Sequence, residues 1–179
     1  MKITTLILFI TITLVGFGQK KSLQLTNAVV VGQIDKPEER YALEGALSNL
    51  LTQNGVKATA SLNYLKLGGD SGVLATDSLS TILKNQGYDT YIIVNVRGYD
   101  RKFKPSERQE PLSEKLGQGS LHELYRQDAV SVTFEFSFYR NGAYVYSDLV
   151  KLGNISDRET VLKRFNKKVG KRITKKWKK

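Results

Sequence analysis

Short apolar runs alternate with helical patterns along the first half of the chain, and this alternation restricts the fold more than any other feature. The run Ala28–Val31 is rich in β-branched residues and predicts a buried strand. Leucines at helical spacing predict a helix over residues 36–54, opened by a capping box of Asp35 and Glu38. Residues 56–64 alternate between apolar and polar and predict a second strand. A strand-helix-strand unit of this kind favours parallel strands.

The second half of the chain has a different pattern, typical of an antiparallel hairpin. After a second, short helix, residues 91–96 form the most strand-like run. Strict alternation over 130–138, the turn Asn141-Gly142 and the return over 144–150 predict the hairpin. We therefore predict a single mixed α/β domain with a five-stranded mixed sheet in the spatial order 2-1-3-4-5. Its chain order is strand, helix, strand, helix, three strands and a C-terminal helix.

The C-terminal helix, predicted over residues 156–178, is amphipathic and strongly basic. A capping box of Ser156 and Glu159 opens it. Its apolar residues recur every three or four positions and form one stripe, which comprises Leu162, Phe165, Val169, Ile173 and Trp177. Residues 158–179 hold eleven basic residues and one acid, whereas residues 20–157 hold 16 of each. The formal net charge of +11 therefore lies almost wholly on this helix.

Three interpretations of the basic face of this helix stay open. It is a solvated outer face, or it contacts an anionic surface such as lipid head groups or envelope glycans, or it binds nucleic acid. An exported protein rarely meets DNA and the sheet lacks an evident aromatic platform, which disfavours nucleic acid. The candidate anion contacts are Lys163, Arg164, Lys167, Lys168, Lys171, Arg172 and Lys175.

Residues 1–18 have the pattern of a secretory signal peptide. Lys2 provides the positive start, residues 3–15 are apolar apart from four Thr, and a small-x-small pattern ends at Gly18. Cleavage near Gly18 would leave residues 19–179 as one exported domain, periplasmic or extracellular, without a transmembrane segment.

No motif in the chain points to catalysis, a cofactor or a metal. The absence of Cys excludes thiol catalysis, disulfides and Cys-based metal sites. A single His disfavours a His-rich metal site. The turn around Ser71 resembles the nucleophile turn of trypsin-like proteases, but His122 lies downstream of it, contrary to that family. Phosphate-binding glycine loops are missing from the first strand-helix junction. A hydrolase using Ser71 or His122 is therefore the disfavoured alternative.

Residues 99–127 form the longest stretch without a regular pattern. A loop of this length inside a compact domain is uncommon, so we expect a partner-binding excursion or a mobile connection. A short helix at 111–116 or at 120–126 fits the sequence. Glu135 and small hydroxyl residues occupy the second face of the fourth strand, which we expect to be solvent-exposed or partly covered.

Three stretches, residues 28–61, 83–101 and 144–177, together resemble a group of uncharacterised bacterial envelope proteins, often lipoproteins. Their layout is also similar to the N-terminal domain of TolB-like proteins. Many members carry a lipid-attachment Cys, which this chain lacks. The resemblance implies a non-catalytic exported envelope protein that acts as an interaction or assembly component. Its partner would be another envelope protein or an anionic surface, and the oligomeric state stays open.

Overall fold

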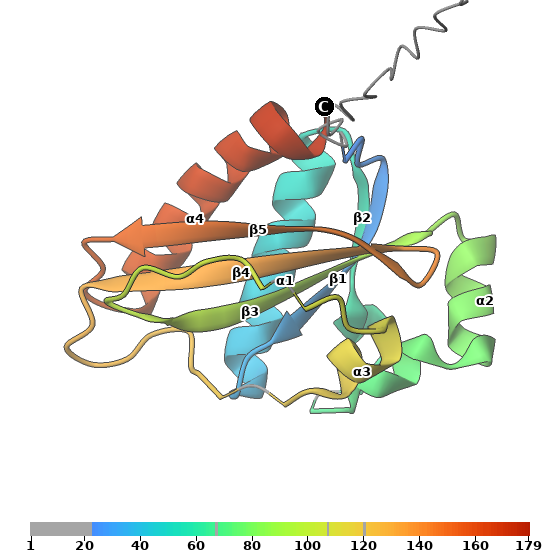
Figure 1. Ribbon diagram of the computed structural model, residues 1–179, viewed down its shortest axis with the longest axis horizontal. Coiled ribbons are helices and arrows are strands. Elements are labelled where there is room, and N and C mark those ends of the chain that lie inside the picture. The colour runs from blue at the N-terminus through green and yellow to red at the C-terminus, as the bar shows by residue number, and fades with distance from the viewer. Residues whose placement is uncertain (1–22, 67, 107, 120) are drawn as a thin grey trace, which may run out of the picture.

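A five-stranded sheet organises the computed structural model, which describes residues 23–66, 68–106, 108–119 and 121–179 (Figure 1). The predicted signal peptide, residues 1–18, lies outside these residues. The strands are β1 (Asn27–Gln33), β2 (Lys57–Ala60), β3 (Thr90–Tyr99), β4 (Ser131–Arg140) and β5 (Ala143–Gly153). The helices are α1 (Pro37–Gln53), α2 (Asp77–Asn85), α3 (Leu112–Gly117) and α4 (Arg158–Arg172). The chain thus forms the predicted mixed α/β domain.

The strand order β2-β1-β3-β4-β5 confirms the predicted arrangement. β1 lies parallel to both β2 and β3, while β3, β4 and β5 run antiparallel. The Asn141-Gly142 turn has positive φ at both residues, 51° and 80°, as a tight hairpin requires. β2 is shorter than predicted because the chain turns into a 3-10 helix, η1 (Ser61–Asn63), where Ser61 bonds to a buried carboxylate of α1.

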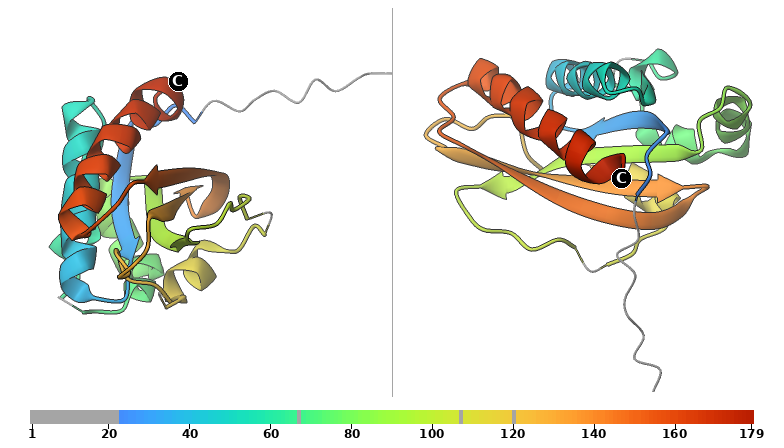
Figure 2. Two further views of the ribbon diagram at one scale, coloured as in Figure 1. Left: turned by 90° about the vertical axis from the view of Figure 1, so that its left-hand side faces the viewer. Right: turned by 90° about the horizontal axis from the view of Figure 1, so that it is seen from above.

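Helices α1 and α4 lie side by side on the first face of the sheet (Figure 2). The α1 stripe of Leu43, Leu47 and Leu51 is fully buried against this face. Along α4, Phe165 meets Phe134 edge to face, with ring centroids 5.2 Å apart. These contacts bury the apolar stripes that the sequence predicted and fix α4 on the sheet, except that Val161 is fully buried and the predicted Leu162 only partly buried.

The last turn of the C-terminal helix is a π-helical turn, η3 (Ile173–Trp177). In an α-helix, residues four apart drift around the axis by about 40° per step, since each residue turns about 100°. A π-helical turn rotates by fewer degrees per residue than an α-helical turn and so offsets this drift. It therefore places Trp177 on the same face of the helix as Phe165 and Val169. Trp177 is completely buried there, with its ring 4.9 Å from Phe136.

A buried ion pair of Arg40 and Glu44 joins α1 to the ends of β1 and β2. Glu44 is inaccessible to solvent and lies 2.9 Å from the Arg40 Nε. Its carboxylate also accepts bonds from the Gly32 N–H at 2.7 Å and from the Ser61 hydroxyl at 2.8 Å. Because every charge is paired, this interior site holds three segments of the chain in one geometry.

The second face of the sheet is covered more fully than the sequence predicted. The segment after β3, here called the strap (residues 100–106 and 108–118), returns across this face and contains α3 (Figure 2). The Ser106 N–H donates to Glu135 at 3.1 Å, and Glu135 is buried to 99%. The expectation of a solvent-exposed second face on β4 was therefore wrong, whereas the short helix expected at 111–116 is confirmed.

Two helix starts differ from the predicted caps. Asp157, rather than Ser156, caps α4 by accepting a bond from the Thr160 N–H at 2.7 Å. That bond lowers the pKa of the Asp157 carboxyl below its usual value. Lys36 precedes α1 and makes no side-chain cap, so the predicted Asp35 and Glu38 capping box was wrong. Helix α1 instead begins with Pro37, whose fixed φ suits a first helical turn.

Gly98 in β3 allows the strap to lie close to the sheet. Its φ is 145°, and a Cβ there would come within 2.6 Å of the Phe103 ring. We expect Gly98→Ala to lower the free energy of unfolding by about 1–3 kcal/mol, from backbone strain and the clash. Urea denaturation measures this loss. Adding Phe103→Ala should recover only the part due to the clash, and full recovery would contradict a backbone contribution.

Candidate functional site

A basic groove lies between β5, which is an edge strand of the sheet, and α4. Its volume is about 490 Å³. It is defined by its lining residues, which are Leu149, Val150, Lys151, Lys168, Lys171, Arg172, Lys175 and Lys176. Six of these eight side chains are cationic, so the groove is suited to attract an anion.

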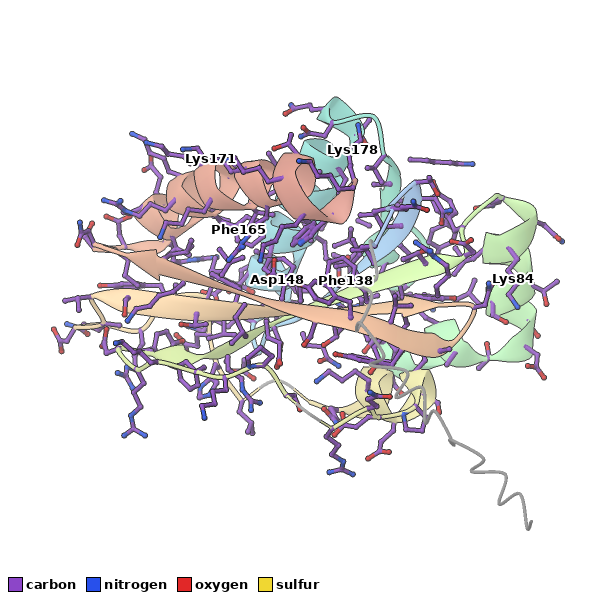
Figure 3. All side chains as sticks on the ribbon, turned by 45° about the horizontal axis from the view of Figure 1, so that its top comes forward. Lys84, Phe138, Asp148, Phe165, Lys171 and Lys178 are labelled. Atoms are coloured by element: carbon purple, nitrogen blue, oxygen red, sulfur yellow. The ribbon has the colours of Figure 1, made fainter. Side chains whose placement is uncertain are left out.

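Contacts between the helix and the edge strand fix the walls of the basic groove. The Lys168 Nζ donates to the Lys151 carbonyl at 2.6 Å, and the Arg172 Nη2 donates to the Leu149 carbonyl at 3.4 Å. Below them, Phe165 and Val169 are buried against the sheet. Figure 3 shows Phe165 and Phe138 between the helix and the sheet, and Lys171 on the outward side of α4.

The acid beside the basic groove is already paired. Asp148 is largely buried, and its Oδ2 accepts from the Trp177 Nε1 at 3.1 Å and lies 3.5 Å from the Arg172 Nε. By contrast, the side chains of Lys171, Lys175 and Lys176 are exposed and form no ion pair with the described residues. These three cations, together with Lys151, are available to an anionic ligand.

The structure divides the seven predicted anion contacts into two sets. Lys168, Lys171, Arg172 and Lys175 line the basic groove. The other three, Lys163, Arg164 and Lys167, are not among its lining residues, and the Nε of Arg164 is buried without a partner among the described residues. The sequence prediction missed Lys151 and Lys176. Lys151 belongs to a strand, so helical spacing could not reveal it, whereas Lys176 lay within the predicted helix.

Ser71 and His122 each have a structural partner. The Ser71 hydroxyl donates to the Leu116 carbonyl at 2.7 Å, which ties the strap to the 3-10 helix η2 (Ser71–Ala75). The His122 ring lies edge-on to Tyr99, with centroids 5.7 Å apart. Burial raises the pKa of Tyr99 to about 12, so its phenol stays protonated and donates to the Glu123 carbonyl. None of these contacts pairs a nucleophile with a base.

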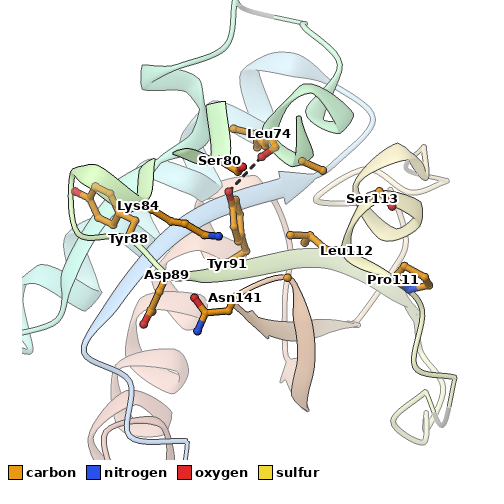
Figure 4. Close-up of a pocket in the computed structure, with 12 residues that line it drawn as sticks. Leu74, Ser80, Lys84, Tyr88, Asp89, Tyr91, Pro111, Leu112, Ser113 and Asn141 are labelled. Carbon is orange, nitrogen blue, oxygen red and sulfur yellow. Dashed lines mark hydrogen bonds between the residues drawn. The ribbon is translucent and has the colours of Figure 1, made fainter. Parts of the chain in front are cut away.

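A second cavity, of about 280 Å³, lies between α2, α3 and the β4–β5 turn (Figure 4). The Tyr91 hydroxyl donates to the Leu74 carbonyl at 3.2 Å, and burial raises the pKa of this phenol. Lys84 reaches toward Tyr91 from α2. The Ser80 hydroxyl donates to the Asp77 carbonyl, so this serine is also held in a structural bond.

Among the residues that the structure describes, there is neither a cluster of metal-binding side chains nor a helix that could span a membrane. Across residues 23–66, 68–106, 108–119 and 121–179, no three His, Asp or Glu side chains gather closely enough to hold a metal ion. Among the same residues, no helix has the length and apolar character needed to cross a bilayer.

The fold and the groove together define a mixed α/β domain with one cationic edge. No family model and no curated protein matches the sequence. The chain is similar to the PelC dodecamer from Paraburkholderia phytofirmans, with 14% identity, coverage of 86% of this chain and 87% of that chain, and a TM-score of 0.46. It is also similar to the lipoprotein GNA1162 from Neisseria meningitidis, with 12% identity, coverage of 83% and 98%, and a TM-score of 0.44. At these values the likeness concerns the general layout, and similarity to TolB-like proteins stays a prediction.

Proposed function

We propose that this protein is an exported, non-catalytic binding module that holds an anionic glycan of the cell envelope in the basic groove. One observation carries the proposal, namely the row of exposed lysines along a recessed groove. Lys171, Lys175 and Lys176 lie on α4 and its last turn, and Lys151 faces them from β5. Cations on both walls of a groove suit a thin, linear polyanion.

The shape of the site favours a polymer over a lipid surface. The lysines border a volume of about 490 Å³ that is bounded on one side by a strand and on the other by a helix. A membrane-binding helix would instead present an apolar face to the bilayer. In α4 the apolar stripe of Val161, Phe165 and Val169 is fully buried against the sheet, so only charge is available to a ligand.

A titration with polygalacturonate, a carboxylated glycan, tests the proposal. We expect saturable binding that weakens about 50-fold between 50 and 200 mM salt, if four lysines each release counterions as on a single-stranded polyanion. The triple variant Lys171→Glu, Lys175→Glu and Lys176→Glu should bind more than tenfold more weakly. Isothermal titration calorimetry at several salt concentrations measures both effects.

A second triple variant provides the matched control. Lys66→Glu, Lys84→Glu and Lys104→Glu changes the net charge equally at exposed positions outside the basic groove. It should retain most of the affinity. Equal losses in the two triple variants would overturn the proposal, and so would binding to phosphatidylglycerol vesicles without binding to the glycan.

A further inference from the structure

A third cavity lies where the connections of two parallel strands diverge. The chain leaves β1 for α1 on the first face of the sheet, and it leaves β3 for the strap on the second face. In open α/β sheets of this strand order, ligands bind in the crevice at the carboxyl ends of the strands where such connections separate. Here that place holds a cavity of about 170 Å³, lined by Gln33 of β1 and Asn95 and Arg97 of β3. We call it the switch-point cavity.

One row of polar residues crosses β1, β3 and β4 at this cavity. Gln33 pairs with Asn95, and Asn95 pairs with Glu135, in adjacent register positions of β1, β3 and β4. The Gln33 amide is used to hold the strap, since it donates to the Lys115 carbonyl at 2.5 Å and to the Gln118 carbonyl at 3.1 Å. The other two members of the row have unmet bonding capacity.

The Asn95 Oδ1 and the Glu135 Oε2 are buried and have no hydrogen-bond donor among the described residues. Leaving a buried acceptor without a donor costs about 1–3 kcal/mol, so such atoms are rare without a reason. The Arg97 guanidinium lies 3.8 Å from the Glu135 Oε2, near enough for an ion pair but too far for a hydrogen bond. Asn95 therefore lines the cavity with an unmet acceptor, and Glu135 lies opposite it in the sheet register with a second one.

Each of the two cations that line the switch-point cavity has an acidic neighbour. Arg97 faces Glu135, and the Lys115 Nζ lies 4.0 Å from the Glu110 carboxylate. Gln118 donates to the same Glu110 carboxylate at 2.7 Å. The acidic neighbours offset the attraction of Arg97 and Lys115 for a simple anion, and the lining itself holds no carboxylate, which disfavours a metal ion. At the rim, Leu121 is 90% exposed and offers an apolar contact.

We infer that the switch-point cavity binds a neutral sugar residue. Sugar hydroxyl groups both donate and accept hydrogen bonds. They would donate to the Asn95 amide oxygen and accept from Arg97 and Lys115, while the apolar C–H face of the ring packs on Leu121. The volume equals that of about six water molecules, which limits the ligand to a single ring. This inference does not rest on the basic groove.

NMR titration of the full exported domain with methyl glycosides of glucose, galactose and mannose tests the inference. We expect at least one glycoside to shift the amides of Asn95–Arg97 and Gln118–Gly119 saturably, with a dissociation constant on the order of 1 mM for so small a ligand. Arg97→Met should weaken binding at least fivefold, and the isosteric Asn95→Asp should also weaken it. Arg101→Met, at an exposed position outside the cavity lining, should leave it unchanged.

Three results would overturn the inference. The first is the absence of saturable shifts with all three glycosides, and the second is equal binding by wild type and Arg97→Met. The third is saturation of the same amides by calcium or by glycine while the glycosides have no effect. The groove variant Lys171→Glu, Lys175→Glu and Lys176→Glu should bind the glycoside like the wild type, which separates this test from that of the proposed function.

Discussion

Replacing Glu44 with leucine is expected to lower the free energy of unfolding by about 3–5 kcal/mol, because it leaves Arg40 charged and buried without its partner. The substitution also removes the acceptor for the Gly32 and Leu62 N–H groups and for the Ser61 hydroxyl. Urea denaturation followed by far-UV circular dichroism measures the loss.

Glu38→Leu is the matched control for Glu44→Leu, since Glu38 lies on the same helix and is exposed. It should change the stability by less than about 1 kcal/mol. The double variant Arg40→Met and Glu44→Leu should be more stable than Glu44→Leu alone, because no unpaired charge then stays in the interior. A loss below 1 kcal/mol for Glu44→Leu would contradict the central role of this ion pair.

Replacing Trp177 with alanine is expected to cost about 3–5 kcal/mol of stability, as for other fully buried aromatic residues. The ring contacts Phe136 and Phe138, with centroids at 4.9 and 5.0 Å, and its Nε1 donates to Asp148. Losing it would leave a cavity between the last helical turn and the sheet. Thermal unfolding followed by circular dichroism tests this expectation.

Tyr41→Ala serves as the comparison for Trp177→Ala, because the Tyr41 side chain is 64% exposed. Its effect should stay within about 0.5 kcal/mol. The loss of stability for Trp177→Phe should lie between those of Tyr41→Ala and Trp177→Ala. Phenylalanine keeps part of the aromatic contact but loses the hydrogen bond to Asp148. If Trp177→Ala unfolds at the wild-type temperature, the C-terminal turn does not contribute to the core.

The sheet could be predicted from the sequence because its order depends on patterns that extend over many residues. The runs at Ala28–Val31 and 91–96 identified the central strands, and the short crossovers left few possible arrangements. The stripe on α4 was equally clear, since burial of Phe165 and Val169 requires only helical spacing. Features that repeat along the chain were therefore predictable.

Features that depend on one contact were not predictable. The strap has no periodic pattern, and its position depends on single pairs such as Ser106 with Glu135 and Phe103 over Gly98. The cap of α4 was assigned to Ser156 because a hydroxyl and a carboxylate one residue apart are both good caps, and only the geometry selects Asp157.

The candidate sites divide in the same way. The cationic residues of α4 were found from their spacing, but the groove that they line also needs a strand that lies far from them in the sequence. The switch-point cavity left a faint signal, because Gln33 ends the apolar run of β1 and Asn95 interrupts that of β3. Recognising it required knowing that these two residues lie side by side in the sheet.

The side chains that α4 sends onto β5 have a consequence for the protein at high concentration. An open strand edge is a template for association with other strands, and aggregation often begins there. Here Lys168 and Arg172 occupy the outward carbonyl groups of Lys151 and Leu149, and they add charge that repels a second copy. The opposite edge, β2, has only four residues. We therefore expect both sheet edges to resist strand pairing with a second copy, whether or not a ligand is bound.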